Sequence, residues 1–178
     1  MYVKIVLFIA ALFVFLPGCK KEQQMDMDNP NVEIFVKQLK NGTYKEFKKD
    51  KNGEQIWLGL PEFRQEHIAS LIAFSSDTTH INDYPVNPIL SLRPIPGGRS
   101  YFILGECLLS IVETIRGDVN PERFLVDASI EDFNERYKGV TTTEILSISN
   151  QYKQWWNNYK DGDWKANDPL VGTSYKWY

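Results

Sequence analysis

The sequence predicts a single, mostly α-helical domain, and three observations support this fold class. Apolar residues recur at helical spacing along residues 101–116 and again along residues 141–160. A shorter amphipathic pattern covers residues 32–39. Without residues 1–18 the chain keeps 160 residues, which suffice for one domain with its own core. We therefore expect an all-α, compact multi-helix domain over residues 31–178 that contains a long Pro-rich loop.

The first helix is expected directly after Asn29-Pro30, because Asn is a good N-cap and Pro is well tolerated at the first helical position. One face of this helix is apolar and consists of Val32, Phe35, Val36 and Leu39. Asn41-Gly42 is a typical helix end. The pattern therefore predicts a short amphipathic helix.

Residues 43–61 leave two alternatives open. The apolar Ile56-Trp57-Leu58 fits a short strand as well as a docked loop, and Asn52-Gly53 lies among Lys-rich turns. A second helix is expected from Phe63 to Phe74. Its apolar face consists of Ile68, Leu71 and Ile72.

Residues 75–100 are expected to form a long loop, because four prolines exclude any long regular element there. These prolines are Pro85, Pro88, Pro94 and Pro96. Long loops inside compact domains are often functional, so Tyr84 is a candidate binding residue. The alternative is a stiffened crossover that packs on the helices through its apolar residues, which are Ile89, Leu90, Leu92 and Ile95.

The clearest helix is predicted from Tyr101 to Arg116 and ends at Gly117. Its wide apolar stripe is typical of a central core helix and consists of Ile103, Leu104, Cys107, Leu108, Ile111, Val112 and Ile115. A thiol in such a stripe behaves as a small hydrophobic group. Asn120-Pro121 and Ser129-x-x-Asp132 are expected to cap two further short helices.

Thr141-x-x-Glu144 is a capping box that predicts a last long helix reaching Lys160, with Gly162 beyond its end. The predicted core stripe of this helix consists of Ile145, Ile148, Tyr152, Trp155 and Tyr159. Helix pairs of this length also occur in α-solenoid repeats, so a HEAT-like arrangement stays open.

Four of the five Trp residues lie between residues 155 and 178, so the C-terminal end is rich in aromatic side chains. Trp155 falls on the core stripe, whereas Trp156 lies on the flank, either exposed or covered by the tail that contains Trp164 and Trp177. Exposed aromatic side chains are common in carbohydrate sites and protein interfaces. Trp156 and Trp164 are therefore candidate binding residues.

No motif in the sequence indicates a catalytic centre, a cofactor or a metal. His67 and His80 lack a Cys or carboxylate at metal-ligand spacing. Gly-x-Ser-x-Gly, His-Glu-x-x-His and phosphate-binding Gly loops are absent from the sequence. The helix-spaced acids are best explained as a solvated surface, and they are Glu62, Glu66, Glu131, Asp132 and Glu135. An acidic chain without a basic stripe also argues against nucleic-acid binding.

The N-terminus has the features of a secretory signal. Lys4 precedes twelve residues without a polar side chain, Ile5 to Leu16, which is too short for a membrane span. Leu16-Pro17-Gly18-Cys19 follows, and it resembles the lipobox of diacylglyceryl-modified bacterial lipoproteins. The resemblance implies cleavage after residue 18, acylation of the Cys19 thiol and stable anchoring by several acyl chains.

Residues 19–30 then comprise the lipidated Cys and a flexible polar tether. The mature chain would have 19 basic and 23 acidic residues, because Lys4 is the only charged residue removed. Three segments are similar to a domain-of-unknown-function family of lipoproteins from Bacteroidetes-type bacteria, and they are Pro85-Val86-Asn87-Pro88, residues 104–109 and Glu113-Thr114-Ile115-Arg116. This resemblance covers most of residues 30–178 and implies no established activity.

The sequence thus favours a membrane-anchored envelope lipoprotein that binds a protein partner or a glycan without catalysis. We expect the outer membrane, because Lys20 and Lys21 stand where an inner-membrane retention signal would have Asp. Two alternatives stay open. One is an envelope hydrolase acting on glycan or peptide, and the other is a structural subunit of an envelope assembly.

Overall fold

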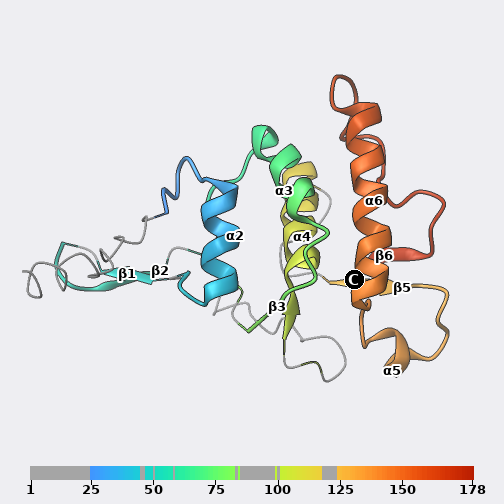
Figure 1. The fold of residues 1–178 in the computed structure, drawn as a ribbon, viewed down its shortest axis with the longest axis horizontal. Helices are drawn as coiled ribbons and strands as arrows, with labels where there is room; N and C mark the ends of the chain where they lie inside the picture. The colour runs from blue at the N-terminus through green and yellow to red at the C-terminus, as the bar shows by residue number, and fades with distance from the viewer. Residues whose placement is uncertain are drawn as a thin grey trace, which may run out of the picture.

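The computed structural model describes residues 25–44, 47–49, 51–57, 59–82, 84, 99, 101–117 and 124–178. These residues form five α-helices and three two-stranded antiparallel sheets (Figure 1). The helices are α2 (Val32–Asn41), α3 (Ile68–Phe74, preceded by the 3-10 turn η2, Gln65–His67), α4 (Leu104–Arg116), α5 (Phe133–Arg136) and α6 (Thr142–Tyr159). The paired strands are β1 (Phe47–Lys49) with β2 (Gln55–Trp57), β3 (His80–Ile81) with β4 (Phe102–Ile103), and β5 (Leu125–Asp127) with β6 (Tyr175–Trp177). The prediction of a mostly helical domain is confirmed.

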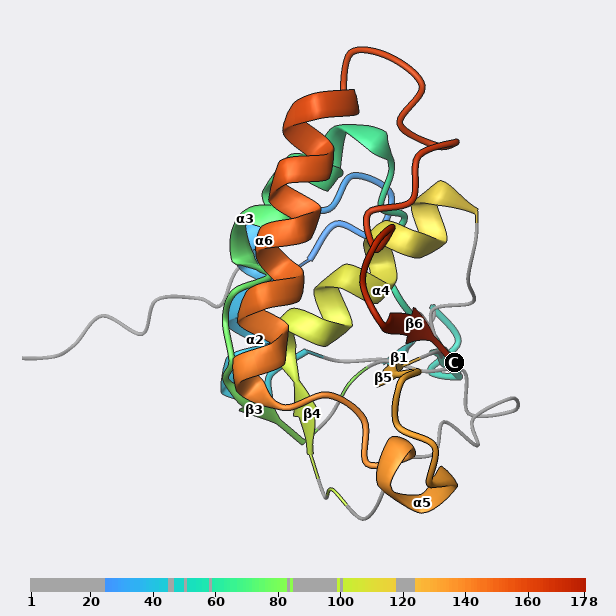
Figure 2. The same ribbon diagram turned by 90° about the vertical axis from the view of Figure 1, so that its right-hand side faces the viewer.

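Helix α4 lies at the centre of the domain and contacts α2, α3 and α6 (Figures 1 and 2). Its predicted apolar stripe is buried, Cys107 included, except for the half-buried Ile115. The prediction of a central core helix that ends at Gly117 is therefore confirmed. Its predicted start is wrong by three residues, because the extended Ile103 pairs with His80 and the helix begins at Leu104.

Helices α3 and α4 meet at Gly105, where no side chain would fit. A Cβ atom at this position would collide with the carbonyl oxygen of Ser75. The same junction contains a buried hydrogen bond of 2.6 Å between the hydroxyls of Ser75 and Ser149, which joins the end of α3 to α6. The Gly105 N–H donates to the Asp77 carbonyl at 2.8 Å. Close backbone contact and paired hydroxyls thus fix these three helices against one another.

Helix α2 follows the predicted pattern, with a shifted start. The Asn31 side chain, rather than Asn29, caps the helix by accepting from the Ile34 N–H at 3.0 Å. Pro30 is buried just before this cap. The predicted end at Gly42 is confirmed, because its left-handed backbone directs the N–H back to the carbonyls of Gln38 and Leu39.

The ambiguous segment 43–61 contains a strand pair, since β1 and β2 form a hairpin that extends away from the helices (Figure 1). The helix predicted from Phe63 to Phe74 is present, but it is shorter than predicted. Its regular α-helical part begins at Ile68, and its apolar face is buried as predicted.

The predicted loop 75–100 is interrupted at its start, because His80–Ile81 form β3 and pair with β4. The four prolines and the apolar residues proposed for a crossover lie outside the described residues, so the alternatives for this segment stay predictions. None of the described helices is long and apolar enough to cross a membrane. The signal segment and Cys19 also lie outside the described residues.

Of the two short helices predicted after α4, one is present as α5 with a shifted cap, and the other is not tested. Asn120-Pro121 lies outside the described residues, and residues 125–127 form strand β5. Asp132, not Ser129, caps α5 by accepting from the Glu135 N–H at 2.9 Å. The sequence pattern does not predict strand β5, because its partner β6 lies at the far end of the sequence.

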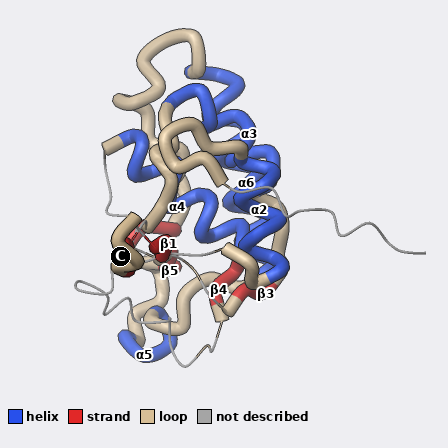
Figure 3. Tube along the Cα trace, turned by 90° about the vertical axis from the view of Figure 1, so that its left-hand side faces the viewer, coloured by secondary structure: helices blue, strands red, loops and turns tan. Residues whose placement is uncertain are grey.

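Helix α6 confirms the capping box, since Thr141 and Glu144 accept from each other's backbone N–H groups. The predicted core stripe is buried except at Tyr159, which is 39% exposed because the helix extends past the core at this end. Figure 3 shows α2, α3, α4 and α6 gathered together, and Figure 1 shows the β1–β2 hairpin and α5 on opposite sides of this group. The helices have unequal lengths, and the described part of the chain shows no HEAT-like series of pairs.

Candidate functional site: an aromatic and charged cluster at helix α6

The last turns of α6 present two adjacent tryptophans to different environments. Successive helix residues point about 100° apart, so Trp155 faces the core while Trp156 lies on the flank. Trp155 is buried, as predicted, and Trp156 is half-buried. Their ring centroids are 5.7 Å apart.

The segment after α6 turns back and places Trp164 against both rings. The Trp164 centroid lies 6.3 Å from Trp155 and 6.0 Å from Trp156, in edge-on geometry. The Trp155 indole N–H fixes this turn by donating to the Asn167 carbonyl at 2.7 Å. We call Trp155, Trp156 and Trp164 the aromatic cluster. Trp156 is therefore partly covered by the tail, through Trp164, and partly exposed.

A network of buried charged and polar groups lies beside the aromatic cluster. Arg116, in the last turn of α4, donates from Nη1 to both carboxylate oxygens of Glu113, at 3.1 and 3.2 Å. Its guanidinium carbon lies 5.6 Å from the centroid of the Trp155 ring, a cation–π distance. Both charged side chains are only 4% exposed.

The network continues through Tyr152 to the C-terminal strand. The Tyr152 hydroxyl donates to Glu113 at 2.7 Å and accepts from the Trp177 indole N–H at 2.9 Å. Burial, and then the negative charge of Glu113, raise the pKa of Tyr152 well above 10.0. The phenol therefore stays protonated and acts as a donor. We call Glu113, Arg116, Tyr152 and Trp177 the buried charge network.

A second buried carboxylate lies earlier on α4. Glu106 accepts from the Leu125 N–H at 2.9 Å and from Arg99 Nη2 at 3.2 Å. Arg99 also donates to the Val140 carbonyl at 3.3 Å. Glu106 therefore ties strand β5 to the central helix, and its hydrogen bonds account for both oxygens. This arrangement stabilises the fold.

Comparison with known protein families identifies the family of this chain. The family model described as Domain of unknown function (DUF4943) matches residues 26–178. The chain belongs to this family. Neither a curated protein nor a solved structure gives a significant match. The DUF4943 domain begins next to the first described residue and includes the aromatic cluster and the buried charge network.

Within the DUF4943 domain, the three predicted binding residues differ in accessibility. Trp156 is half-buried, whereas Trp164 is only 6% exposed. Tyr84 is 3% exposed and its hydroxyl lies 3.3 Å from the Cys107 carbonyl, far from the surface role expected for a loop residue. The structure brings Trp156 and Trp164 together, and a binding role for the three residues stays a prediction.

Three of the five surface acids considered in the sequence have structural partners within the DUF4943 domain. Glu62 pairs with Arg64 at 2.9 Å, Asp132 caps α5, and Glu135 pairs with Lys138 at 2.7 Å. All the acids considered in the sequence are exposed, as a solvated surface requires. Among the described residues, no group of three His, Cys, Asp or Glu could hold a metal ion.

Sequence reasoning missed Glu113 and Arg116 as parts of the site. The sequence does contain a signal for a second buried face of this helix. Glu106 and Glu113 are seven residues apart, so they lie near the same face of the helix. Strand β5 contacts that face where the Leu125 N–H donates to Glu106, and β6 is joined to it through Trp177 and Tyr152. The helix therefore has buried residues on almost all sides, rather than one buried stripe.

Proposed function

We propose that this protein is a lipid-anchored lipoprotein of the bacterial outer membrane, and that its DUF4943 domain is a non-catalytic binding module. The lipobox-like Leu16-Pro17-Gly18-Cys19 supports the anchor. The family match begins seven residues after Cys19, so a short tether would join the acylated Cys19 to the domain. The ligand is a protein or a glycan, and it contacts the domain at Trp156.

The observation that carries the binding proposal is the support beneath Trp156. Its ring is partly accessible, and it rests on Trp155 and Trp164, which are themselves held by the turn after α6. A rigid aromatic surface loses little conformational entropy on binding. Polar groups border the aromatic cluster, because Lys165 lies over the Trp164 ring at 5.3 Å. The exposed Asp168 lies 3.9 Å from Arg116, whose guanidinium is over the Trp155 ring. Aromatic faces with polar neighbours suit both sugar rings and protein surfaces.

The anchor is tested with the full chain, leader included, produced in a bacterium that processes lipoproteins. We expect labelled palmitate to be incorporated into the wild type, and the protein to partition with membranes. Cys19→Ser should abolish both. Wild-type protein in the aqueous fraction, without its first 18 residues and with an unmodified Cys19 thiol, would refute the anchor.

The binding surface is tested by replacing Trp156 with a photo-crosslinking phenylalanine in living cells. Gln154 provides a matched control, because it is exposed on the same helix but points in another direction. A protein ligand should give adducts from position 156 only. A glycan ligand should instead shift the tryptophan fluorescence of the wild type, and not of Trp156→Ala, when glycans released from the host envelope are added. Absence of both effects contradicts the binding proposal.

A structural subunit of an envelope assembly is the second candidate, favoured by a row of aromatic rings at the α5 end. Phe133 stacks on Tyr137 with centroids 5.6 Å apart, and Tyr137 contacts Phe124 edge-on at 5.4 Å. Tyr178 continues the row at 5.8 Å from Phe124. Phe133 and Tyr178 are more than half exposed. Such exposed aromatic rings are enriched at protein interfaces, and Phe133→Ser should release the protein from its assembly if this function holds.

A further inference from the structure

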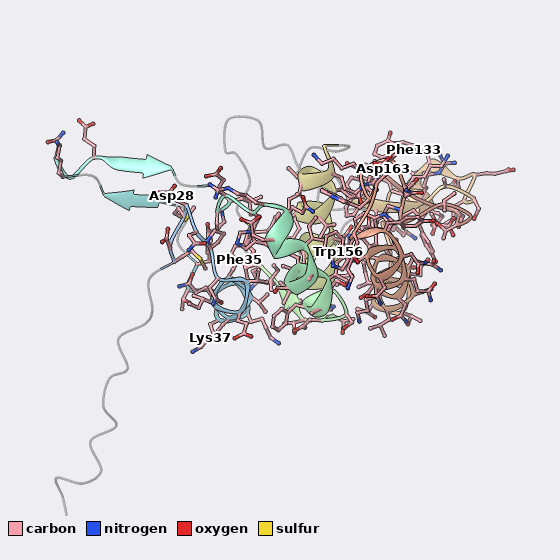
Figure 4. The ribbon with its side chains drawn as sticks, turned by 90° about the horizontal axis from the view of Figure 1, so that it is seen from above. Asp28, Phe35, Lys37, Phe133, Trp156 and Asp163 are labelled. Carbon is pink, nitrogen blue, oxygen red and sulfur yellow. The ribbon has the colours of Figure 1, made fainter. Side chains whose placement is uncertain are left out.

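The turn of the β1–β2 hairpin contains Asn52-Gly53, and both residues are exposed. Gly53 has a left-handed backbone, at φ 83, with open space where a Cβ would stand. Figure 4 shows the hairpin projecting from the helical body, with Asp28 of the tether near its base and Phe133 and Asp163 at the opposite end of the molecule. The turn therefore lies outside the core, in contact with solvent.

An asparagine that precedes glycine can react with its own backbone. The glycine nitrogen forms a bond to the side-chain carbon Cγ and gives its proton to water, while the bond between Cγ and the amide nitrogen breaks and ammonia leaves. Glycine favours this attack because it has no side chain to obstruct the nitrogen and its backbone rotates freely. Water then opens the cyclic succinimide, either at Cγ to give aspartate or at the main-chain carbonyl to give isoaspartate. Each conversion consumes water and releases ammonia without any change of oxidation state.

The sequence contains three dipeptides that can form a succinimide, and they are Asn41-Gly42, Asn52-Gly53 and Asp161-Gly162. They differ in how the glycine N–H is bound. The Gly42 N–H donates to carbonyls in the last turn of α2, and the Gly162 N–H donates at 2.9 Å to a carbonyl in the last turn of α6. Within the described part of the chain, the Gly53 N–H donates to no acceptor. Only at Asn52, therefore, does the attack break no hydrogen bond of the attacking nitrogen.

Asn41 and Asn52 form a matched pair, because Lys precedes each of them and Gly follows. Both side chains are exposed, so access to water does not distinguish them. Asn41 is the last residue of α2 and Gly42 is its C-cap, so ring closure there requires the helix end to open. Ring closure at Asn52 requires movement only within the turn of a local hairpin, which opens more easily than an element joined to the core.

We propose that Asn52 is a site of spontaneous deamidation, which converts it in the folded protein to aspartate and isoaspartate. The reaction replaces a neutral amide with a carboxylate, so the turn beside Lys51 gains a negative charge. Isoaspartate also adds a carbon to the backbone of the turn, which disturbs the register that pairs Lys49 with Gln55. The converted fraction increases with the age of the protein. The reaction requires neither the lipid anchor nor a ligand.

The test incubates the purified, folded protein at neutral pH and follows both asparagines by peptide mass spectrometry. Electron-transfer fragmentation distinguishes isoaspartate from aspartate. The same chain unfolded in guanidinium chloride gives the rates that the local sequence alone allows. We expect Asn41 and Asn52 to convert at similar rates in the unfolded chain. In the folded protein Asn52 should stay within a few-fold of that rate, whereas Asn41 should slow about tenfold or more, because its reaction requires the helix end to open.

Two variants assign the reaction to its residue. Ring closure is much slower for the longer side chain of Gln, so Asn52→Gln should abolish the acidic species that accumulates on ion-exchange chromatography. Asn41→Gln is the matched control and should leave this species unchanged. Protection of Asn52 to the same degree as Asn41 in the folded protein would overturn the proposal. Equally fast conversion of both would overturn it too, because the fold would then not select the site.

Hydrogen exchange of fresh and aged protein tests the structural consequence. Exchange should accelerate several-fold in β1 and β2 of the aged protein, because isoaspartate weakens the pairing of the two strands. Exchange in α4 and α6 should stay the same, because these helices contact each other in the core. An equal acceleration in α4 would contradict a local effect of the modification. The comparison uses wild-type protein throughout, so it does not depend on the folding of a variant.

Discussion

The two ends of the domain differ in how their short antiparallel sheets are held. At the C-terminal end, β5 is bound to the central helix through Leu125 and Glu106, and β6 is bound to α6 through Trp177 and Tyr152. At the tether end, β1 and β2 belong to one hairpin, pair with each other and extend outside the helical body (Figure 4). The first sheet is part of the core, whereas the second is a local unit.

This difference predicts two kinds of stability within one domain. Elements joined by buried contacts unfold together, whereas elements with local contacts can open by themselves. The aromatic cluster belongs to the cooperative part, which suits a rigid binding surface. The hairpin belongs to the local part.

Glu113→Ala should be the most destabilising of these substitutions, by about 3–5 kcal/mol in the free energy of unfolding. It removes the buried carboxylate partner of Arg116, and the remaining carboxylate, Asp168, lies 3.9 Å away with its side chain 63% exposed. It also removes the acceptor of the Tyr152 hydroxyl. Urea denaturation followed by circular dichroism measures this loss.

Glu135→Ala is the matched control for Glu113→Ala. It breaks an ion pair with Lys138 at the same helical spacing, but both side chains are more than half exposed. The expected loss is below about 1 kcal/mol. Equal losses for the two substitutions would show that the buried charge network does not hold the C-terminal end.

Gly105→Ala should cost about 1–3 kcal/mol, although Ala is the better helix former. The added Cβ meets the Ser75 carbonyl, so α3 and α4 must move apart. Gly162→Ala provides a control, because the nearest atom to its Cβ is the Tyr159 carbonyl oxygen at 3.9 Å. Thermal unfolding compares the two variants, and a stable Gly105→Ala would contradict the close helix contact.

Tyr152→Phe should cost about 1–3 kcal/mol at neutral pH, because Glu113 loses a donor and the Trp177 indole N–H loses its acceptor. The loss should shrink at high pH. The pKa of Tyr152 in the folded protein is raised by burial and then by the Glu113 charge, so above about pH 10 the unfolded state ionises first. Wild-type stability therefore falls by up to about 1.4 kcal/mol per pH unit, a loss that the Phe variant lacks. A constant difference between the two proteins from pH 7 to 11 would contradict this role for the phenol.

The sequence predicts those elements whose signals are local. The capping box at Thr141 and Glu144 determines where α6 begins, and Gly42 and Gly117 mark the ends of α2 and α4. In each case the residues that form the cap lie within a few positions of one another. Their hydrogen bonds therefore follow from spacing alone.

The strand pairings and the site depend on contacts between distant residues, which spacing cannot show. Leu125 pairs with Trp177 near the end of the chain. The apolar run after α4 therefore forms a strand only because β6 pairs with it. The same sheet is joined to the buried Glu113 through Trp177 and Tyr152. The burial of Trp164 depends on the path of the tail after Lys160, which the local pattern does not determine.

Two glycines provide the smallest and most discriminating test of the contrast between the two ends. Gly53, in the hairpin turn, and Gly172, in the turn before β6, both have a left-handed backbone, at φ 83 and 79, with open space around them. Ala at either position costs about 1–2 kcal/mol of backbone strain. Gly172→Ala should lower the global free energy of unfolding by this amount, because its turn unfolds with the core. Gly53→Ala should lower it by less than about 0.5 kcal/mol while hydrogen exchange in β1 and β2 accelerates about tenfold, the factor for about 1.4 kcal/mol. Equal global losses would mean that the hairpin unfolds with the core and that the two sheets are not held differently.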